Sequence, residues 1–254
     1  MNKHLLAPTM LLALVLAVPW ARADGLADLR AALARPQAAV TLRGVLKADT
    51  TSRQGDGPDA DDDRGQAQVQ FEDGPQGLRL MFGRETLQRV EQEERSRQRD
   101  PKARTPTLTG MKALEVHELR GMLSPTAALL AKLDDATPKA EVPEAWNGQP
   151  ARRLSFELGL GKMRERDRKY IKKYEGSLDI WIGADGWPLA LRQQTLASGR
   201  AFLVVSFEMR AKEEQTFLLV DDRLVVVRRD SQGSGAGAGE KGESHALREL
   251  QLLP

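Results

Sequence analysis

Histidine and cysteine are the residues that most often build metal and nucleophile sites, and this chain offers few of them. Its 254 residues include three histidines, His4, His117 and His245, and no cysteine. A zinc site needs three or four such ligands at short spacing, as in the H-E-x-x-H pattern, which does not occur here. The sequence therefore predicts neither a metal site nor a metal cofactor.

Acidic residues near position 60 imitate one calcium-binding pattern. Asp59, Asp61 and Asp63 match the first three ligand positions of an EF-hand loop. However, Arg64 stands where that loop needs glycine, and Gln70 stands where the closing glutamate would bind. A solvated acidic loop is the favoured interpretation.

Signatures of covalent catalysis and phosphate binding are also missing. No G-x-S-x-G elbow, S-x-x-K pair or glycine-rich phosphate loop occurs, and the serines at 231–235 lie in low-complexity sequence. We therefore expect a protein that is not an enzyme, with no catalytic residue and no cofactor. A hydrolase that uses paired carboxylates remains the third alternative, since such pairs need no local motif.

The most unusual segment is GKMRERDRKYIKKYEG at 161–176. Between Lys162 and Glu175 it holds seven basic residues against three acids. Met163, Tyr170, Ile171 and Tyr174 would share one face of a helix, so two interpretations stay open. The first is a charged loop in water. The second is an amphipathic arm that contacts an anionic membrane surface or an acidic envelope protein. Its contact residues would be Lys162, Arg164, Arg166, Arg168, Lys169, Tyr170, Lys172, Lys173 and Tyr174.

The amino terminus has the pattern of a secretory signal peptide. Lys3 gives a basic start, residues 5–18 are mostly apolar, and Ala21 and Ala23 are small residues around a cleavage point. A retained membrane anchor is the alternative, but the apolar run is shorter than the roughly 20 residues that span a bilayer. We expect cleavage near Ala23, a periplasmic location, and no lipid anchor because a lipid-modified terminus needs cysteine.

The charge balance argues against nucleic acid as a partner. The chain has 38 basic and 36 acidic residues, and removal of residues 1–23 takes away Lys3 and Arg22 but no acid. The mature chain is therefore formally neutral, whereas nucleic-acid binders rely on neutralising phosphates. Partners should be recognised by shape and apolar surface instead.

Hydrophobic periodicity divides residues 24–254 into helices and strands of one domain. Leu26, Leu29 and Leu33 predict an amphipathic helix that Asp24 begins and Pro36 ends. Period-two alternation then predicts strands, first in 40–48, 66–72 and 78–82 and, more weakly, in 85–93. The segments 53–65 and 94–106 lack apolar residues and are expected to be loops.

A helical insert then separates two groups of strands. Apolar residues at helical spacing predict one helix from Met111 to Leu123 and a second from Pro125 to Leu133. Further strands are predicted at 151–159, 177–183, 187–196, 202–210, 215–220, 223–230 and 245–253, with 231–244 as a flexible hairpin tip. This order predicts an α+β fold: a strongly curved antiparallel sheet, or incomplete β-barrel, of about 11 strands. The helix at the amino terminus and the helical insert would pack in its concave face.

The hairpin GSLDIWIGADGWPLALRQQ at 176–194 shows the alternation most clearly. Leu178, Ile180 and Ile182 should face the core, and Trp181 should face the other way. Trp187 should cover the open end of the sheet. The alternative is that a tryptophan ring lines a cavity for an acyl chain.

The element order resembles the bacterial lipoprotein-carrier family, which comprises the LolA and LolB proteins and a related lipid-sensing regulator of the envelope stress response. Two local stretches also resemble it: WNGQPARRLSFEL at 146–158 and SLDIWIGADGWPLALRQQ at 177–194. The resemblance implies an incomplete barrel whose helices form a lid over an apolar cavity.

Two functions follow as hypotheses. The first is a periplasmic carrier or sensor that holds an acyl chain, a lipid or a lipoprotein without chemistry, with adaptable methionines at the ligand. Its cavity would be lined by Leu42, Leu80, Phe82, Met111, Leu114, Met122, Phe156, Ile180 and Trp181. The second is a structural or regulatory envelope protein with a filled core that acts through its surface.

Overall fold

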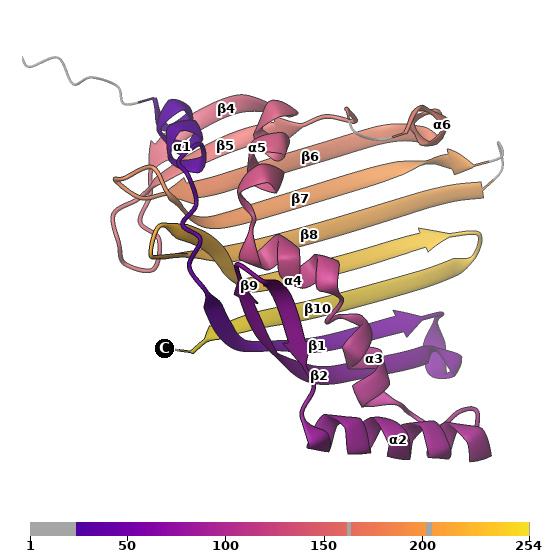
Figure 1. Ribbon diagram of the computed structural model, residues 1–254. Coiled ribbons are helices and arrows are strands. Elements are labelled where there is room, and N and C mark those ends of the chain that lie inside the picture. The colour runs from indigo at the N-terminus through magenta and orange to yellow at the C-terminus, as the bar shows by residue number, and fades with distance from the viewer. Residues whose placement is uncertain (1–23, 162–163, 202–204, 254) are drawn as a thin grey trace, which may run out of the picture.

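A computed structural model describes residues 24–161, 164–201 and 205–253, and its centre is one open antiparallel sheet (Figure 1). Ten strands follow one another in the order β3-β2-β1-β10-β9-β8-β7-β6-β5-β4, so that β3 and β4 are the edges. Their bounds are β1 Leu42–Gln54, β2 Asp61–Gly74, β3 Gly77–Met81, β4 Ala136–Pro143, β5 Arg152–Leu158, β6 Ile171–Ile182, β7 Pro188–Ala201, β8 Val205–Val220, β9 Arg223–Gly237 and β10 Glu240–Leu252.

Helices cover one face of this sheet. Those that cross it are α1 Gly25–Leu33, α3 Pro106–Lys112, α4 Val116–Leu123 and α5 Thr126–Asp134, which run diagonally over the strands in Figure 1. Helix α2, Arg84–Arg99, lies beside the β2–β3 edge, α6, Glu165–Arg168, is a single turn before β6, and a short 3-10 turn spans Gly57–Asp59. No helix among the described residues is long and apolar enough to cross a bilayer. The α+β class and the open antiparallel sheet agree with the sequence prediction.

The sheet curls toward its helices. Arg223 of β9 donates to the Asp73 carboxylate of β2, although β10 and β1 lie between these strands in the sheet. Strands in a flat sheet are about 4.8 Å apart, so β9 and β2 would be separated by about 14 Å. A direct contact therefore requires curvature. Arg223 also donates to the Leu123 carbonyl of α4 at 3.2 Å, which places the helices on the concave side.

The core lies between the concave face and the helices. The fully buried side chains include Leu29 of α1, Leu119 and Met122 of α4, Phe71 of β2 and Ile180 of β6, all in one apolar cluster. Alternation along β6 is as predicted, because Leu178, Ile180 and Ile182 join the core while Asp179 and Trp181 point to the opposite face.

Several predicted strand limits were wrong because the strands continue through polar sequence. The predicted loop 53–65 is largely strand, since β1 runs to Gln54 and β2 begins at Asp61. The predicted flexible tip 231–244 is a ladder in which β9 pairs β10 up to Gly237 and Glu240. The predicted strands 202–210 and 215–220 belong to the one strand β8, of which the structure describes Val205–Val220. These backbones pair with neighbouring strands, on one side for Asp61–Gly65 and on both sides for β8 and β9, so their ladders need no apolar side chains.

Two helical regions and one edge strand differ from the prediction. Residues 85–93 lie in helix α2 rather than in a strand, and α2 continues to Arg99 through the predicted loop. The single predicted helix 111–123 corresponds to the end of α3 and the whole of α4. Helix α3 ends before its C-cap, Ala113. Edge strand β4 was missed, because its sequence ATPKAEVP carries two prolines. With ten strands, the predicted count of about 11 was slightly too high.

Helix α1 is held at the β6–β7 turn. Asp24 begins it as predicted, accepting from the backbone N–H groups of Leu26 and Ala27. Gly186 has φ +83°, and a Cβ there would lie 2.7 Å from the Asp28 carbonyl oxygen of α1. Trp187 is buried beside this contact, with the Arg35 guanidinium 5.6 Å from its ring centre. Trp187 therefore covers this end of the sheet, as expected.

Candidate functional site

The predicted cavity-lining residues belong to two faces of the sheet. On the concave face, Leu42, Leu114, Met122, Phe156 and Ile180 are buried in the apolar core. Leu80, Phe82 and Met111 are half-buried and pack against the same core. Trp181 lies on the opposite face. The structure thus brings eight of the nine together in one apolar core, to which both the concave face and the helices contribute.

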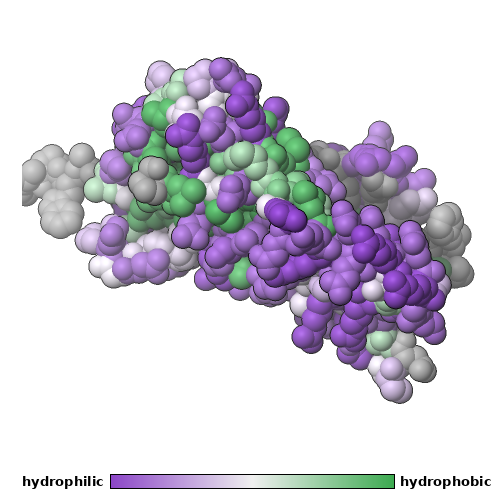
Figure 2. All heavy atoms as spheres, turned by 60° about the horizontal axis from the view of Figure 1, so that its bottom comes forward, coloured by the Kyte–Doolittle hydropathy of each residue, from purple (hydrophilic) through white to green (hydrophobic). Residues whose placement is uncertain are grey.

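The core becomes partly accessible along one border of the concave face. There the half-buried apolar residues are Val40, Leu78, Leu80, Phe82 and Leu252, which we call the apolar rim. Leu80 pairs with Phe71 and Leu252 with Gly44, so both side chains point to the concave side. Figure 2, viewed from the side of β2 and α2, shows hydrophobic residues gathered in one region of a largely hydrophilic surface. An apolar ligand would meet the core here.

Polar contacts fasten the helices over this core. Glu118 of α4 accepts from Arg229 of β9 at 3.0 Å and lies 3.7 Å from Arg248 of β10. Lys132 of α5 contacts Gln193 of β7, and Arg30 of α1 bonds Asp134 of α5 at 2.9 Å. A hollow of about 310 Å³ lies beside Glu118 and is otherwise lined by residues of β8, β9 and β10.

Trp181 is the centre of a separate cluster on the convex face. Its ring lies 4.8 Å from that of Trp146, with the Arg192 guanidinium 5.4 Å above it. The indole N–H donates to Glu144 at 2.9 Å, and Arg153 donates to the same carboxylate at 2.7 Å. The Arg153 and Trp181 hydrogen bonds lower the pKa of Glu144 below its ordinary value. Because Glu144 and Trp146 lie between β4 and β5, these contacts tie the β4–β5 connection to the sheet.

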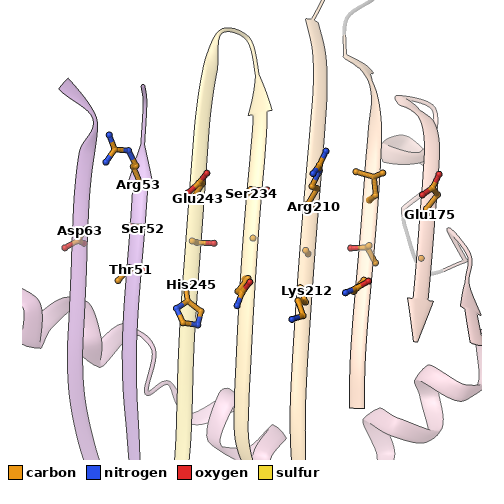
Figure 3. A pocket seen from close by; sticks show the side chains of 18 of the residues that line it. Thr51, Ser52, Arg53, Asp63, Glu175, Arg210, Lys212, Ser234, Glu243 and His245 are labelled. Carbon is orange, nitrogen blue, oxygen red and sulfur yellow. The ribbon is translucent and has the colours of Figure 1, made fainter. Parts of the chain in front are cut away.

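A polar hollow of about 1100 Å³ lies near the free end of the β9–β10 hairpin (Figure 3). Its charged side chains include Arg53, Arg210, Lys212, Glu243 and His245. These positions alternate with those that face the helices, so the charges stand on the convex side. None of the nine predicted cavity residues lines it. Sequence reasoning missed this hollow, since the parts of β1, β2, β9 and β10 that contribute to it within 53–65 and 231–244 were predicted as loops.

Most charges in this polar hollow already have partners. Arg53 bonds Asp62 at 3.2 Å, Lys212 lies 3.4 Å from Glu214, and the His245 ring contacts Asp230 at 2.9 Å. No cluster of three or more metal-ligating side chains occurs within the described ranges. His245 is the cross-strand partner of Thr51, and its Nε2 contacts the Asp230 carboxylate. The hollow is a polar surface on which most charges are paired.

The basic segment has a different structure from the amphipathic helix that was considered. Within the described part of this segment Glu165–Arg168 is the helical turn, and Ile171 and Tyr174 belong to β6. The helical face predicted for Tyr170, Ile171 and Tyr174 is therefore wrong, and burial raises the pKa of the Tyr174 hydroxyl. The basic residues Arg164, Arg166, Arg168, Lys169, Lys172 and Lys173 are exposed, while Lys162 and Met163 lie outside the described residues, as does the signal segment 1–23.

Comparison with known proteins gives no relative for this chain: no family model, no curated protein and no solved structure matches it.

Proposed function

We propose that the protein is an exported binding protein that holds an acyl chain of a lipid or lipoprotein against the concave face of its sheet, as a carrier or sensor. The resemblance to the lipoprotein-carrier family, the periplasmic location and the absence of catalysis are parts of this proposal. The observation that supports it is the apolar rim, where partly accessible residues on β3 and β10 and beside β1 and β3 pack against the core. Exposed apolar area of this kind is typical of ligand sites.

The ligand would enter by displacement of helices rather than into a preformed cavity. Leu119, Met122, Leu123 and Leu129 of α4 and α5 are almost fully buried against the sheet. An acyl chain can replace these contacts with similar apolar contacts at small net cost, because the lost burial is regained on the ligand. The polar contacts of Glu118 and Lys132 would then limit how readily the helices move.

Binding of cis-parinaric acid, a fluorescent fatty acid, tests this proposal. Leu80→Asp places a charge on the apolar rim, and we expect at least a tenfold loss of affinity because the carboxylate would have to be desolvated by the ligand. Leu87→Asp is the control, since it adds the same charge at an exposed leucine of α2 that lies outside the rim. Equal affinity of the two variants would contradict a site at the rim.

A second function is favoured by the same buried side chains. If Leu119, Met122, Leu123 and Leu129 never leave the sheet, the core is filled and the protein acts through its surface as an envelope interaction protein. Native mass spectrometry of protein purified from its own host distinguishes the two. Bound lipid supports the carrier, whereas lipid-free protein with a stoichiometric protein partner supports the second function.

A further inference from the structure

The exposed basic residues at one end of the sheet form a single surface. Arg166 and Lys169 lie in or next to α6, Lys172 begins β6, and Arg200 lies near the end of β7. The Arg200 N–H donates to the Tyr170 carbonyl at 2.9 Å, which joins the two segments. We call this surface, formed by Arg164, Arg166, Arg168, Lys169, Lys172, Lys173 and Arg200, the basic corner.

The basic corner concentrates positive charge in a chain whose net charge is zero. Residues 24–254 hold 36 basic and 36 acidic residues, whereas 161–176 alone has a net charge of +4, to which Arg200 adds. The remainder of that chain is therefore net negative. Lys173 is paired with Glu175 at 2.7 Å, but both side chains stay more than half exposed. The basic side chains of this surface are therefore exposed at this end of the sheet.

We infer that the basic corner docks the protein onto an anionic lipid membrane. Charge complementarity carries this choice, since each Lys or Arg near an anionic leaflet contributes roughly 1 kcal/mol of attraction. The corner is at the opposite end of the strands from the β6–β7 turn and α1 (Figure 1), so docking leaves that part of the molecule accessible. Lys169 lies 4.9 Å from the centre of the half-buried Tyr170 ring, which keeps one aromatic group at the contact.

The structure also predicts the mode of attachment. Ile171 and Tyr174 are fixed in the β6 ladder by pairing with β7 and are turned from solvent at least in part. They are not available for insertion as one face of a helix, so attraction between charges must dominate. Binding should therefore weaken steeply between low and physiological salt. This inference does not depend on the proposed lipid cargo.

Vesicle flotation tests the inference with the full mature chain. The probe is vesicles of phosphatidylglycerol mixed with phosphatidylethanolamine, compared with pure phosphatidylcholine vesicles. The test variant is Arg166→Glu/Lys169→Glu/Lys172→Glu, and the control is Arg84→Glu/Arg97→Glu/Arg99→Glu, which makes the same charge change on the exposed helix α2. Thermal unfolding of both variants checks that they remain folded.

We expect the mature chain to bind only the anionic vesicles and the basic-corner variant to lose binding on the order of a hundredfold, given three reversed charges. The α2 variant should keep most of its binding. An equal loss in both variants would show that only total charge matters, and no binding by the unsubstituted chain at low salt would overturn the inference outright. The same variant can also be compared with the unsubstituted chain for self-association. If the substitutions abolish self-association rather than vesicle binding, the basic corner binds acidic residues of a second copy, such as Asp61–Asp63, and the membrane is the wrong partner.

Discussion

Arg223 and Asp73 join strands that are three positions apart in the sheet. The guanidinium is also shared with two backbone carbonyl groups, those of Val40 at 3.0 Å and Leu123 at 3.2 Å. One side chain thus connects β9, β2, the start of β1 and the end of α4. Because the Arg223 side chain is only 11% exposed, these contacts are poorly replaced by water. The pair fixes the curvature on which the concave face depends.

Replacement of this arginine should lower stability strongly. Arg223→Met keeps the volume but leaves a half-buried carboxylate and two carbonyl groups without their donor. We expect a loss of about 2–4 kcal/mol in the free energy of unfolding, measured by urea denaturation. The control is Arg43→Met, which removes an exposed pair with Glu72 on neighbouring strands and should leave the urea midpoint nearly unchanged. Similar midpoints for both variants would contradict the role of Arg223 in closing the sheet.

The attachment of helix α2 should depend on one carboxylate. Glu93 accepts from the backbone N–H groups of Thr107 at 2.9 Å and Leu108 at 3.0 Å, at the start of α3. Since α2 contains no buried residue, little else holds it. Glu93→Ala should therefore speed amide hydrogen exchange throughout α2 and leave the central strands unchanged. Glu94→Ala, at the exposed neighbouring position, is the control. Equal exchange rates in the two variants would show that Glu93 does not hold α2 in place.

Glycine should be required at position 186 for two separate reasons. Gly186→Ala forces a Cβ against the Asp28 carbonyl and also places alanine at φ +83°. Gly148→Ala has only the second problem, since φ is +78° and no atom lies within 4 Å of the new Cβ. We expect a loss of about 1 kcal/mol for Gly148→Ala and clearly more for Gly186→Ala, measured by thermal unfolding. Equal losses of stability in the two variants would mean that α1 moves away from the new Cβ without lowering stability.

Acid titration should reveal the contact between Trp181 and Glu144. The hydrogen bonds from Arg153 and Trp181 lower the pKa of Glu144. The contact therefore stabilises the folded state above the pKa of an unfolded glutamate and is lost as pH falls through the lower folded value. In a Trp187→Phe background, tryptophan fluorescence should change with a midpoint below about 4.3, the ordinary pKa of glutamate. Arg153→Met should raise that midpoint, whereas an unchanged midpoint would argue that another group controls the signal.

Helices and strands were predicted correctly where burial on one side produces a periodic pattern of apolar residues. The buried leucines of α1 and the alternation of Leu178, Ile180 and Trp181 were readable because each lies against the core on one side only. Helix α2 gave no such pattern, since it buries nothing, and its weak alternation was taken for a strand. The β9–β10 ladder was missed for a related reason: glycine, serine and alanine there pair through the backbone alone.

The candidate sites follow the same division. Eight of the nine proposed lining residues do share the concave face, because an apolar residue in a half-buried strand or helix can be assigned to a face. Alternation assigned Trp181 to the opposite face, but the sequence did not show that Trp146 and Arg192 lie against its ring there. The joining of Arg200 to the basic segment depends on strand pairing and has no local signal.

The two prolines of β4 have a consequence for the molecule in crowded solution. A barrel that does not close leaves backbone groups along its outermost strand, and such a row can recruit another chain and start a fibril. Pro138 and Pro143 lack an N–H to offer, and the pairing with β5 is irregular around Lys139, which adds a charge at that border. The prolines thereby hinder the addition of another strand at β4, and replacement of these residues by valine would be the route to aggregation.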